Sequence, residues 1–192
     1  AALALAIAYV LVHEEGTIDI DFLKNRTNSP SLVNVETGRI LFDEATGKSL
    51  YMDADGTPKT YDTCADPQLE GEFEVNGTPC KTGFTLYKEH IAKYTPEYQE
   101  QITTVPADTV RQIAKELGAS ACIGQTTTID GVELPYRPAA VDAFSGITRH
   151  KHTWLTCQAV FTLNNLIGST NAVGGFCGFD PICNGWTDDN PN

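Results

Sequence analysis

The sequence of 192 residues has no apolar run long enough to cross a bilayer, because a membrane-spanning helix needs about 20 such residues. Basic residues are scarce: 13 lysines and arginines stand against 25 acidic residues, which gives a formal net charge of −12. So acidic a chain is a poor candidate for binding nucleic acid or an anionic membrane surface. The six cysteines do not have the Cys-x-x-Cys spacing of zinc or iron–sulfur sites, so the sequence offers no metal-ligand set.

What the chain does contain is typical of a folded protein, with 41% hydrophobic and 20% charged residues. Its length suits one ordinary domain or two small ones. Residues 1–12 form an uncharged apolar run that predicts a buried helix ending at Gly16. Because this helix would open at the first residue without a cap, we expect the chain to be a fragment of a longer protein.

Turn residues and apolar runs predict four parts. Dipeptides such as Asn76-Gly77 and Asp130-Gly131 are strong hairpin signals, and Thr95 followed by Pro96 is typical of a helix start. The predicted parts are a helix-and-strand piece of an α/β domain (1–35), a hairpin-rich surface insertion (36–82), an α/β segment (83–178) and an unstructured tail (179–192).

The mostly apolar run 139–144 predicts a central strand in a mostly parallel sheet with helices packed on it. After it come Gly146, the basic loop Arg149-His150-Lys151-His152 and a predicted helix over 154–167. The buried side of this helix is predicted to carry Leu155, Ala159, Leu163 and Leu166. Ligands of open α/β folds bind at the carboxyl ends of strands, and a helix N-terminus favours anions.

The basic loop is the most informative electrostatic feature, because no acidic residue occurs between Asp142 and Asp180. Arg149 supplies a forked donor suited to phosphate, and Lys151 supplies a point charge. The loop therefore predicts a site for an anionic ligand, such as a pyrophosphate or a phosphorylated cofactor. A solvated basic loop is the alternative.

Several motifs occur in the order and spacing of a known family. They are Arg137-Pro138-Ala139-Ala140-Val141, Gly146-x-x-x-His150, Leu163-Asn164-x-Leu166-x-Gly168, Gly174-Gly175 and, upstream, Tyr94-Thr95-Pro96-Glu97 and Val105-Pro106-Ala107. With them the chain resembles the catalytic subunits of the dimethyl sulfoxide reductase family of molybdopterin oxidoreductases, over most of residues 1–178.

The resemblance implies an interior segment of such a catalytic subunit. Family members carry molybdenum or tungsten on two molybdopterin guanosine dinucleotides, often with a 4Fe-4S cluster in the N-terminal part. By this match Gly146, Thr148, Arg149 and His150 carry over as cofactor contacts, while no catalytic or metal-ligating residue falls in this stretch. The cofactor-binding segment is then 83–178.

The resemblance also implies partners and a broad activity. The partners are the remainder of the catalytic subunit and, by analogy with relatives, a membrane anchor and an iron–sulfur electron-transfer subunit. The parent enzyme would be an anaerobic respiratory reductase or dehydrogenase acting on sulfur or arsenic oxyanions or on organic substrates, with a periplasmic location favoured over a cytoplasmic one. The rival hypothesis is a non-catalytic, disulfide-stapled acidic binding module from outside the cytoplasm, which uses the even number of cysteines.

Overall fold

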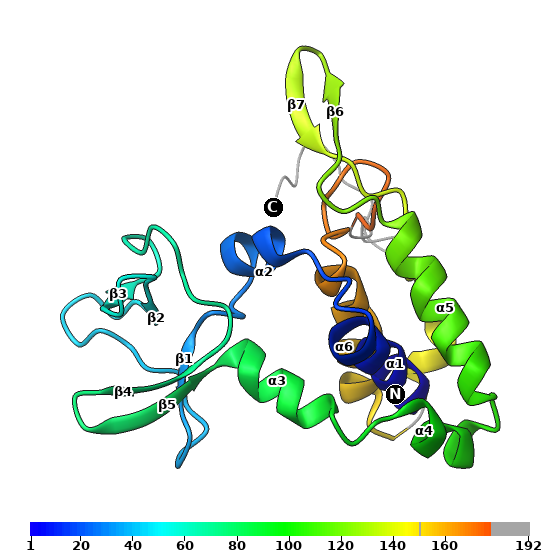
Figure 1. The fold of residues 1–192 in the computed structure, drawn as a ribbon, viewed down its shortest axis with the longest axis horizontal. Helices are drawn as coiled ribbons and strands as arrows, with labels where there is room; N and C mark the ends of the chain where they lie inside the picture. The colour runs from blue at the N-terminus through cyan, green and yellow to red at the C-terminus, as the bar shows by residue number, and fades with distance from the viewer. Residues whose placement is uncertain (150, 178–192) are drawn as a thin grey trace, which may run out of the picture.

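The computed structural model describes residues 1–149 and 151–177. Helices gather in one half of the molecule and short strands in the other, while one hairpin projects from the helical half (Figure 1). The helices are α1 (Ala2–Tyr9), the π-helical turn η1 (Val10–Glu14), α2 (Ile20–Arg26), α3 (Gly83–Ile91), α4 (Pro96–Thr103), α5 (Ala107–Ser120), the 3-10 turn η2 (Ser145–Thr148) and α6 (Thr153–Leu166). The strands are β1 (Leu32–Asn34), β2 (Leu50–Met52), β3 (Pro58–Thr60), β4 (Glu72–Val75), β5 (Thr78–Thr82), β6 (Thr126–Ile129) and β7 (Val132–Pro135).

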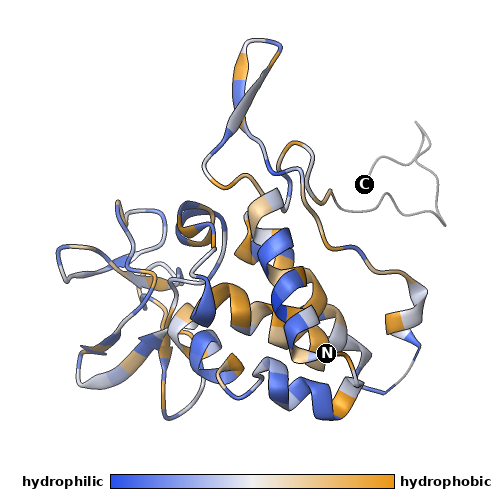
Figure 2. Ribbon diagram, turned by 45° about the vertical axis from the view of Figure 1, so that its right-hand side comes forward, coloured by the Kyte–Doolittle hydropathy of each residue, from blue (hydrophilic) through white to orange (hydrophobic). Residues whose placement is uncertain are grey.

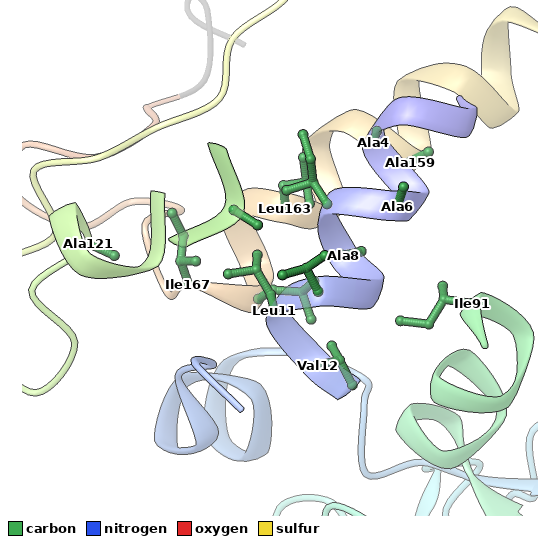
Figure 3. Packing of buried hydrophobic residues seen from close by; sticks show 14 of the residues in the cluster. Ala4, Ala6, Ala8, Leu11, Val12, Ile91, Ala121, Ala159, Leu163 and Ile167 are labelled. Carbon is green, nitrogen blue, oxygen red and sulfur yellow. The ribbon is translucent and has the colours of Figure 1, made fainter. Parts of the chain in front are cut away.

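The predicted first helix forms and lies at the centre of the larger hydrophobic core. A helix that is apolar on every side has to be covered on every side, and α1 contacts α3, α4, α5 and α6. Its small alanines let neighbouring helices approach closely, and Leu11 extends the contact into η1 toward Leu163 and Ile167 at the C-terminal end of α6 (Figure 3). The helix ends before Gly16, as predicted, with that glycine at φ +62°.

Local capping explains where the shorter helices begin. The Asp19 side chain accepts a hydrogen bond from the Phe22 N–H at the start of α2, and the Thr82 hydroxyl accepts one from Thr85 N–H at the start of α3. The Thr95 hydroxyl caps α4, which confirms the start predicted from the sequence. Each cap satisfies a backbone donor that the first helical turn leaves without a partner.

The strands make three small antiparallel sheets, with the order β1-β5-β4 in the largest and β2-β3 and β6-β7 as separate pairs. The hairpins predicted at Asn76-Gly77 and Asp130-Gly131 are confirmed as β4–β5 and β6–β7. A second, smaller core of four buried residues supports the strand half, which is more hydrophilic overall than the central helices (Figure 2). Those core residues are Leu32, Met52, Val75 and Cys80.

The predicted mostly parallel sheet is wrong. Every named strand pair is antiparallel, and within the described residues the parallel pairings are two isolated bridges, Tyr136 with Val173 and Thr170 with Phe176. The run 139–144 is not a strand, since no neighbouring strand offers it a ladder. The helices and small sheets are those of an α/β fragment without the central sheet that apolar runs alone suggested.

Strand β2 belongs to two antiparallel pairings. It pairs with β3 from Leu50 opposite Thr60 to Met52 opposite Pro58. The segment just before β2 also forms a hairpin with the preceding segment, through the bridge between Phe42 and Ser49 and the hydrogen bonds from Leu50 N–H to Leu41 C=O and from Asp43 N–H to Lys48 C=O. Among the described helices, none combines the length and apolarity that crossing a membrane requires.

Candidate functional site

The segment that leads to the basic loop begins at a buried ion pair. Arg137 donates from Nε and Nη2 to the Asp19 carboxylate at 2.9 and 2.7 Å, and its Nη1 contacts the carbonyl oxygens of Cys122, Gln125 and Tyr136 at 3.3, 2.9 and 2.8 Å. Both side chains of the pair are less than a tenth exposed. Arg137 therefore connects the start of α2, the turn before β6 and the end of β7. In this way it fixes the point at which residues 138–149 leave the core.

A second buried side chain holds this segment four residues further on. The Asn164 amide of α6 accepts from Val141 N–H and donates to Val141 C=O, each at 2.8 Å. The same oxygen accepts from the Ser169 hydroxyl at 3.1 Å. The amide thus pairs with both backbone groups of Val141, as a neighbouring strand would, although the segment belongs to no sheet.

The predicted site residues lie on an exposed turn rather than in a crevice. Gly146 and Thr148 belong to η2, and the Thr148 hydroxyl donates to Ser145 C=O at 2.9 Å. A Cβ at Gly146 would meet no atom within 4 Å. Arg149 is exposed, and His150 lies outside the described residues. The crevice expected at the carboxyl end of a strand is missing there because the strand itself is missing.

The loop does lie at the N-terminus of α6, as the sequence predicted. His152 is at φ +65° directly before the helix, and in the described part of the chain no side chain caps its first turn. The positive end of a 14-residue helix and the cationic Arg149 and Lys151 therefore occupy one stretch of chain. With no acidic residue from 143 to 177, this end of the molecule is chemically suited to an anion.

Large apolar side chains are exposed on both sides of the loop. Phe144 is 70%, Trp154 71% and Leu155 61% exposed. Leu155 was predicted on the buried side of the last helix, and that placement is wrong. Single exposed apolar residues are ordinary, but three beside one loop are typical of a surface that contacts another molecule or another part of the same protein.

The described part of the chain also forms cavities that the sequence did not reveal. One, of about 280 Å³, lies between α2, α3 and α6, and its wall includes Tyr87, whose hydroxyl is buried without a partner in the described structure. Burial raises the pKa of this hydroxyl. The other is an open cleft of about 960 Å³ beside the Asp19–Arg137 pair. Neither cavity is lined by residues of the basic loop.

The described cysteines count against the disulfide-stapled module. Five of the six cysteines lie in the described part of the chain, and all five are free thiols. Burial, together with the nearby Asp53 carboxylate, raises the pKa of Cys64 to about 11. Cys183 lies outside the described residues. Among the described residues, no group of three histidine, cysteine or acidic side chains is arranged to hold a metal ion.

Known proteins share the sequence of this chain over much of its length. It is 31% identical to a sulfite dehydrogenase subunit of Allochromatium vinosum, over 91% of this chain and 21% of that protein. It is 32% identical to the alpha subunit of the chlorate reductase of Ideonella dechloratans, over 58% of this chain and 14% of that protein. A putative dimethyl sulfoxide reductase catalytic subunit of Halobacterium salinarum is 32% identical over half of this chain and 12% of its own length. No protein-family model matches the chain.

This chain belongs to the molybdopterin oxidoreductase family. The family that the motifs indicated is thereby confirmed, and its members use a molybdenum cofactor. The chain spans about a fifth of the length of the sulfite dehydrogenase relative and a smaller share of the other two relatives. All three relatives are named as enzyme subunits, and the one from Halobacterium salinarum as a putative catalytic subunit.

The family motifs have structural roles that the sequence did not reveal. Arg137 and Asn164 are the two side chains that hold the segment before the loop. Gly168 lies against the Asp19 carboxylate, and a Cβ at Gly175 would lie 2.1 Å from the Ser169 carbonyl oxygen. Several of the motif residues therefore serve close packing around the C-terminal end of α6.

Proposed function

We propose that this chain forms part of the catalytic subunit of a molybdenum- or tungsten-dependent oxidoreductase. The observation that carries the proposal is the match to the sulfite dehydrogenase of Allochromatium vinosum over 91% of the chain. In the proposal, residues 83–178 are the cofactor-binding segment, and the chain contributes no catalytic residue of its own. A 4Fe-4S cluster and an iron–sulfur partner subunit belong to other parts of the assembly.

The proposed ligand of the basic loop is the anionic pterin dinucleotide, of which the enzyme would hold two copies. Gly146, Thr148, Arg149 and His150 would line this contact. Three features support the assignment: a donor set of guanidinium and helix N–H groups, open space above Gly146, and a long acid-free stretch around the loop. When bound, the cofactor supplies oxygen-atom or hydride-equivalent transfer at its metal.

Each loop residue has a distinct proposed part. Arg149 would bind a phosphate oxygen pair through its forked donors, and the first turn of α6 would orient the same anion with backbone N–H groups. The bare Cα of Gly146 would let the cofactor lie close to the backbone. Phe144, Trp154 and Leu155 would be covered by the rest of the subunit, which would exclude water and strengthen the charge contacts.

The parent enzyme, in this proposal, acts on a sulfur or arsenic oxyanion or an organic substrate. Sulfite, the substrate in the name of the relative that covers most of the chain, is a sulfur oxyanion. That name favours sulfur oxyanions within the proposed class.

The test begins with the full-length protein purified without oxygen. We expect molybdenum or tungsten by elemental analysis and a fluorescent pterin after oxidation, and a preparation with neither would contradict the proposal. The variant Arg149→Gln should lose metal and pterin at lower salt than the wild type, because fewer charges hold the anion. Arg39→Gln, which removes an exposed arginine from the strand half, is the matched control and should retain both.

A further inference from the structure

Residues 142–148 pack against α6 through η2 but are not tied to the core by hydrogen bonds in the described part of the chain. Among the described residues, the hydrogen bonds of 142–148 are internal to this stretch: Ala143 N–H with the Asp142 carboxylate, Ile147 N–H with Phe144 C=O, and the Thr148 hydroxyl with Ser145 C=O. The last contact that ties the segment to the core by hydrogen bonds before the loop is therefore the one between Val141 and Asn164.

The Asn164 side chain is built into the core rather than placed at its surface. It has no exposed area, and three hydrogen bonds use its amide. A buried amide without such partners would be costly, so a polar residue at this core position of α6 implies a specific task. That task is to satisfy both backbone groups of Val141, which an apolar side chain cannot do.

Both ends of the loop lie beside the same helix, α6. The loop leaves the core at Val141, beside Asn164 near the C-terminal end of α6, and reaches the exposed start of α6 at Thr153. Eleven residues of helix separate these two points, which is about 16 Å of helical rise. The stretch between Val141 and Thr153 therefore runs back along α6, with one end set by the amide and the other by the helix start.

We propose that Asn164 is a positioning residue for the loop Ser145–Arg149: its amide fixes the point from which the loop returns along α6 to the helix N-terminus. The proposal rests on the proposed function in one respect, because the loop is taken to bind the anionic cofactor. Asn164 itself touches no ligand in this scheme and acts through Val141. Without the tether, the guanidinium of Arg149 and the N-terminus of α6 would no longer be held ready for the same anion.

The test compares Asn164→Ala with Ser169→Ala in the full-length, cofactor-loaded protein. Both variants remove a hydrogen bond from the same amide, but only the first also releases Val141. We expect Asn164→Ala to lose metal and pterin at least about tenfold faster during dialysis, the factor that one to two buried hydrogen bonds supply. Ser169→Ala should release them at the wild-type rate. Thermal midpoints measured on the cofactor-free forms separate this effect from general destabilisation.

Each possible outcome either supports or overturns the proposal. Equal release from both variants, or wild-type release from Asn164→Ala, would overturn the proposal. If Asn164→Ala does not fold, hydrogen exchange in the wild-type protein decides: we expect the Val141 amide to be protected while the Asp142 amide exchanges quickly. Fast exchange at Val141 would overturn the tether. A protein that carries neither metal nor pterin would refute the proposed function, but the same exchange experiment would still test the role of Asn164.

Discussion

The buried pair between Arg137 and Asp19 allows a quantitative prediction. Replacing Arg137 by Met leaves a carboxylate that is 6% exposed without its cation. It also removes a donor from three backbone carbonyls, of which those of Cys122 and Gln125 keep a backbone N–H donor. Breaking a buried ion pair from one side costs about 3–5 kcal/mol of unfolding free energy. We expect Arg137→Met to fall in that range.

Replacing Asp19 by Asn tests the contribution of the carboxylate charge alone. Asp19→Asn retains an oxygen for the Phe22 N–H, so the cap of α2 survives, and it leaves Arg137 with its carbonyl partners. Its expected cost is smaller, about 2 kcal/mol, which is the size of a hydrogen bond to a charged group. In the double variant the costs should not add, and the coupling should be about 2 kcal/mol.

The assay is urea unfolding followed by far-ultraviolet circular dichroism at neutral pH, for the wild type, the two single variants and the double variant. An unchanged slope against urea would show that the variants unfold to the same extent. A cost below about 1 kcal/mol for Arg137→Met, or additivity within about 0.5 kcal/mol, would refute the view that this pair fixes the base of the segment.

Three further predictions follow from local geometry. Gly168→Ala places a Cβ 2.2 Å from an Asp19 carboxylate oxygen at φ +69°, whereas the control Gly47→Ala, at φ +67°, meets no atom within 4 Å. Urea unfolding should show about 1 kcal/mol of destabilisation for the control and clearly more for Gly168→Ala. Equal destabilisation by the two variants would contradict the packing argument. Thr95→Ala removes the cap of α4 and should cost about 1 kcal/mol in the same assay, while no change would show that the cap adds nothing. The pKa of Cys64 is raised from 9.0 to about 11, so between these pH values the folded state keeps a thiol proton that the unfolded state has lost, and the free energy of unfolding should fall from pH 9 to pH 11. The rate of alkylation of Cys64 in the folded protein, followed by mass spectrometry, should therefore rise with pH up to about pH 11. A rate that stops rising near pH 9 would contradict this.

The helices were the most predictable part of the fold, because their signals are local. The apolar run of α1, the Thr95–Pro96 start of α4 and the Asp130-Gly131 turn each depend on a few neighbouring residues, and all three are confirmed. The helix α5 runs through Gly118 to Ser120, although a glycine is a usual signal for the end of a helix. There the glycine serves packing, since a Cβ would lie 2.8 Å from the Thr17 side chain.

The error at 139–144 has an instructive cause. An apolar extended run is typical of a central strand because its backbone needs partners, and the run does have partners at Val141. They come from one side chain more than 20 residues away rather than from a neighbouring strand, and no periodic pattern reveals such a contact. The sheet was predicted wrongly because the sequence shows that hydrogen bonds are needed but not which groups provide them.

The candidate site was predictable only in part. The order of Gly146, Arg149 and the start of α6 follows directly from the chain, so their neighbourhood could be predicted. The exposure of the loop and its dependence on Asn164 arise from contacts between distant segments. The motif Leu163-Asn164-x-Leu166-x-Gly168 pointed to that dependence, but the order of its residues does not say which side chain holds which segment.

The π-helical turn at Val10–Glu14 bears on how this region tolerates changes in length. Such a turn holds one residue more than an α-helical turn, so loss of a single residue there would leave an ordinary α-helix. The same deletion inside α1 would rotate every following alanine by about 100° out of its contacts. Single-residue gaps among natural homologues are therefore expected within residues 10–14 and not within the helix that precedes them.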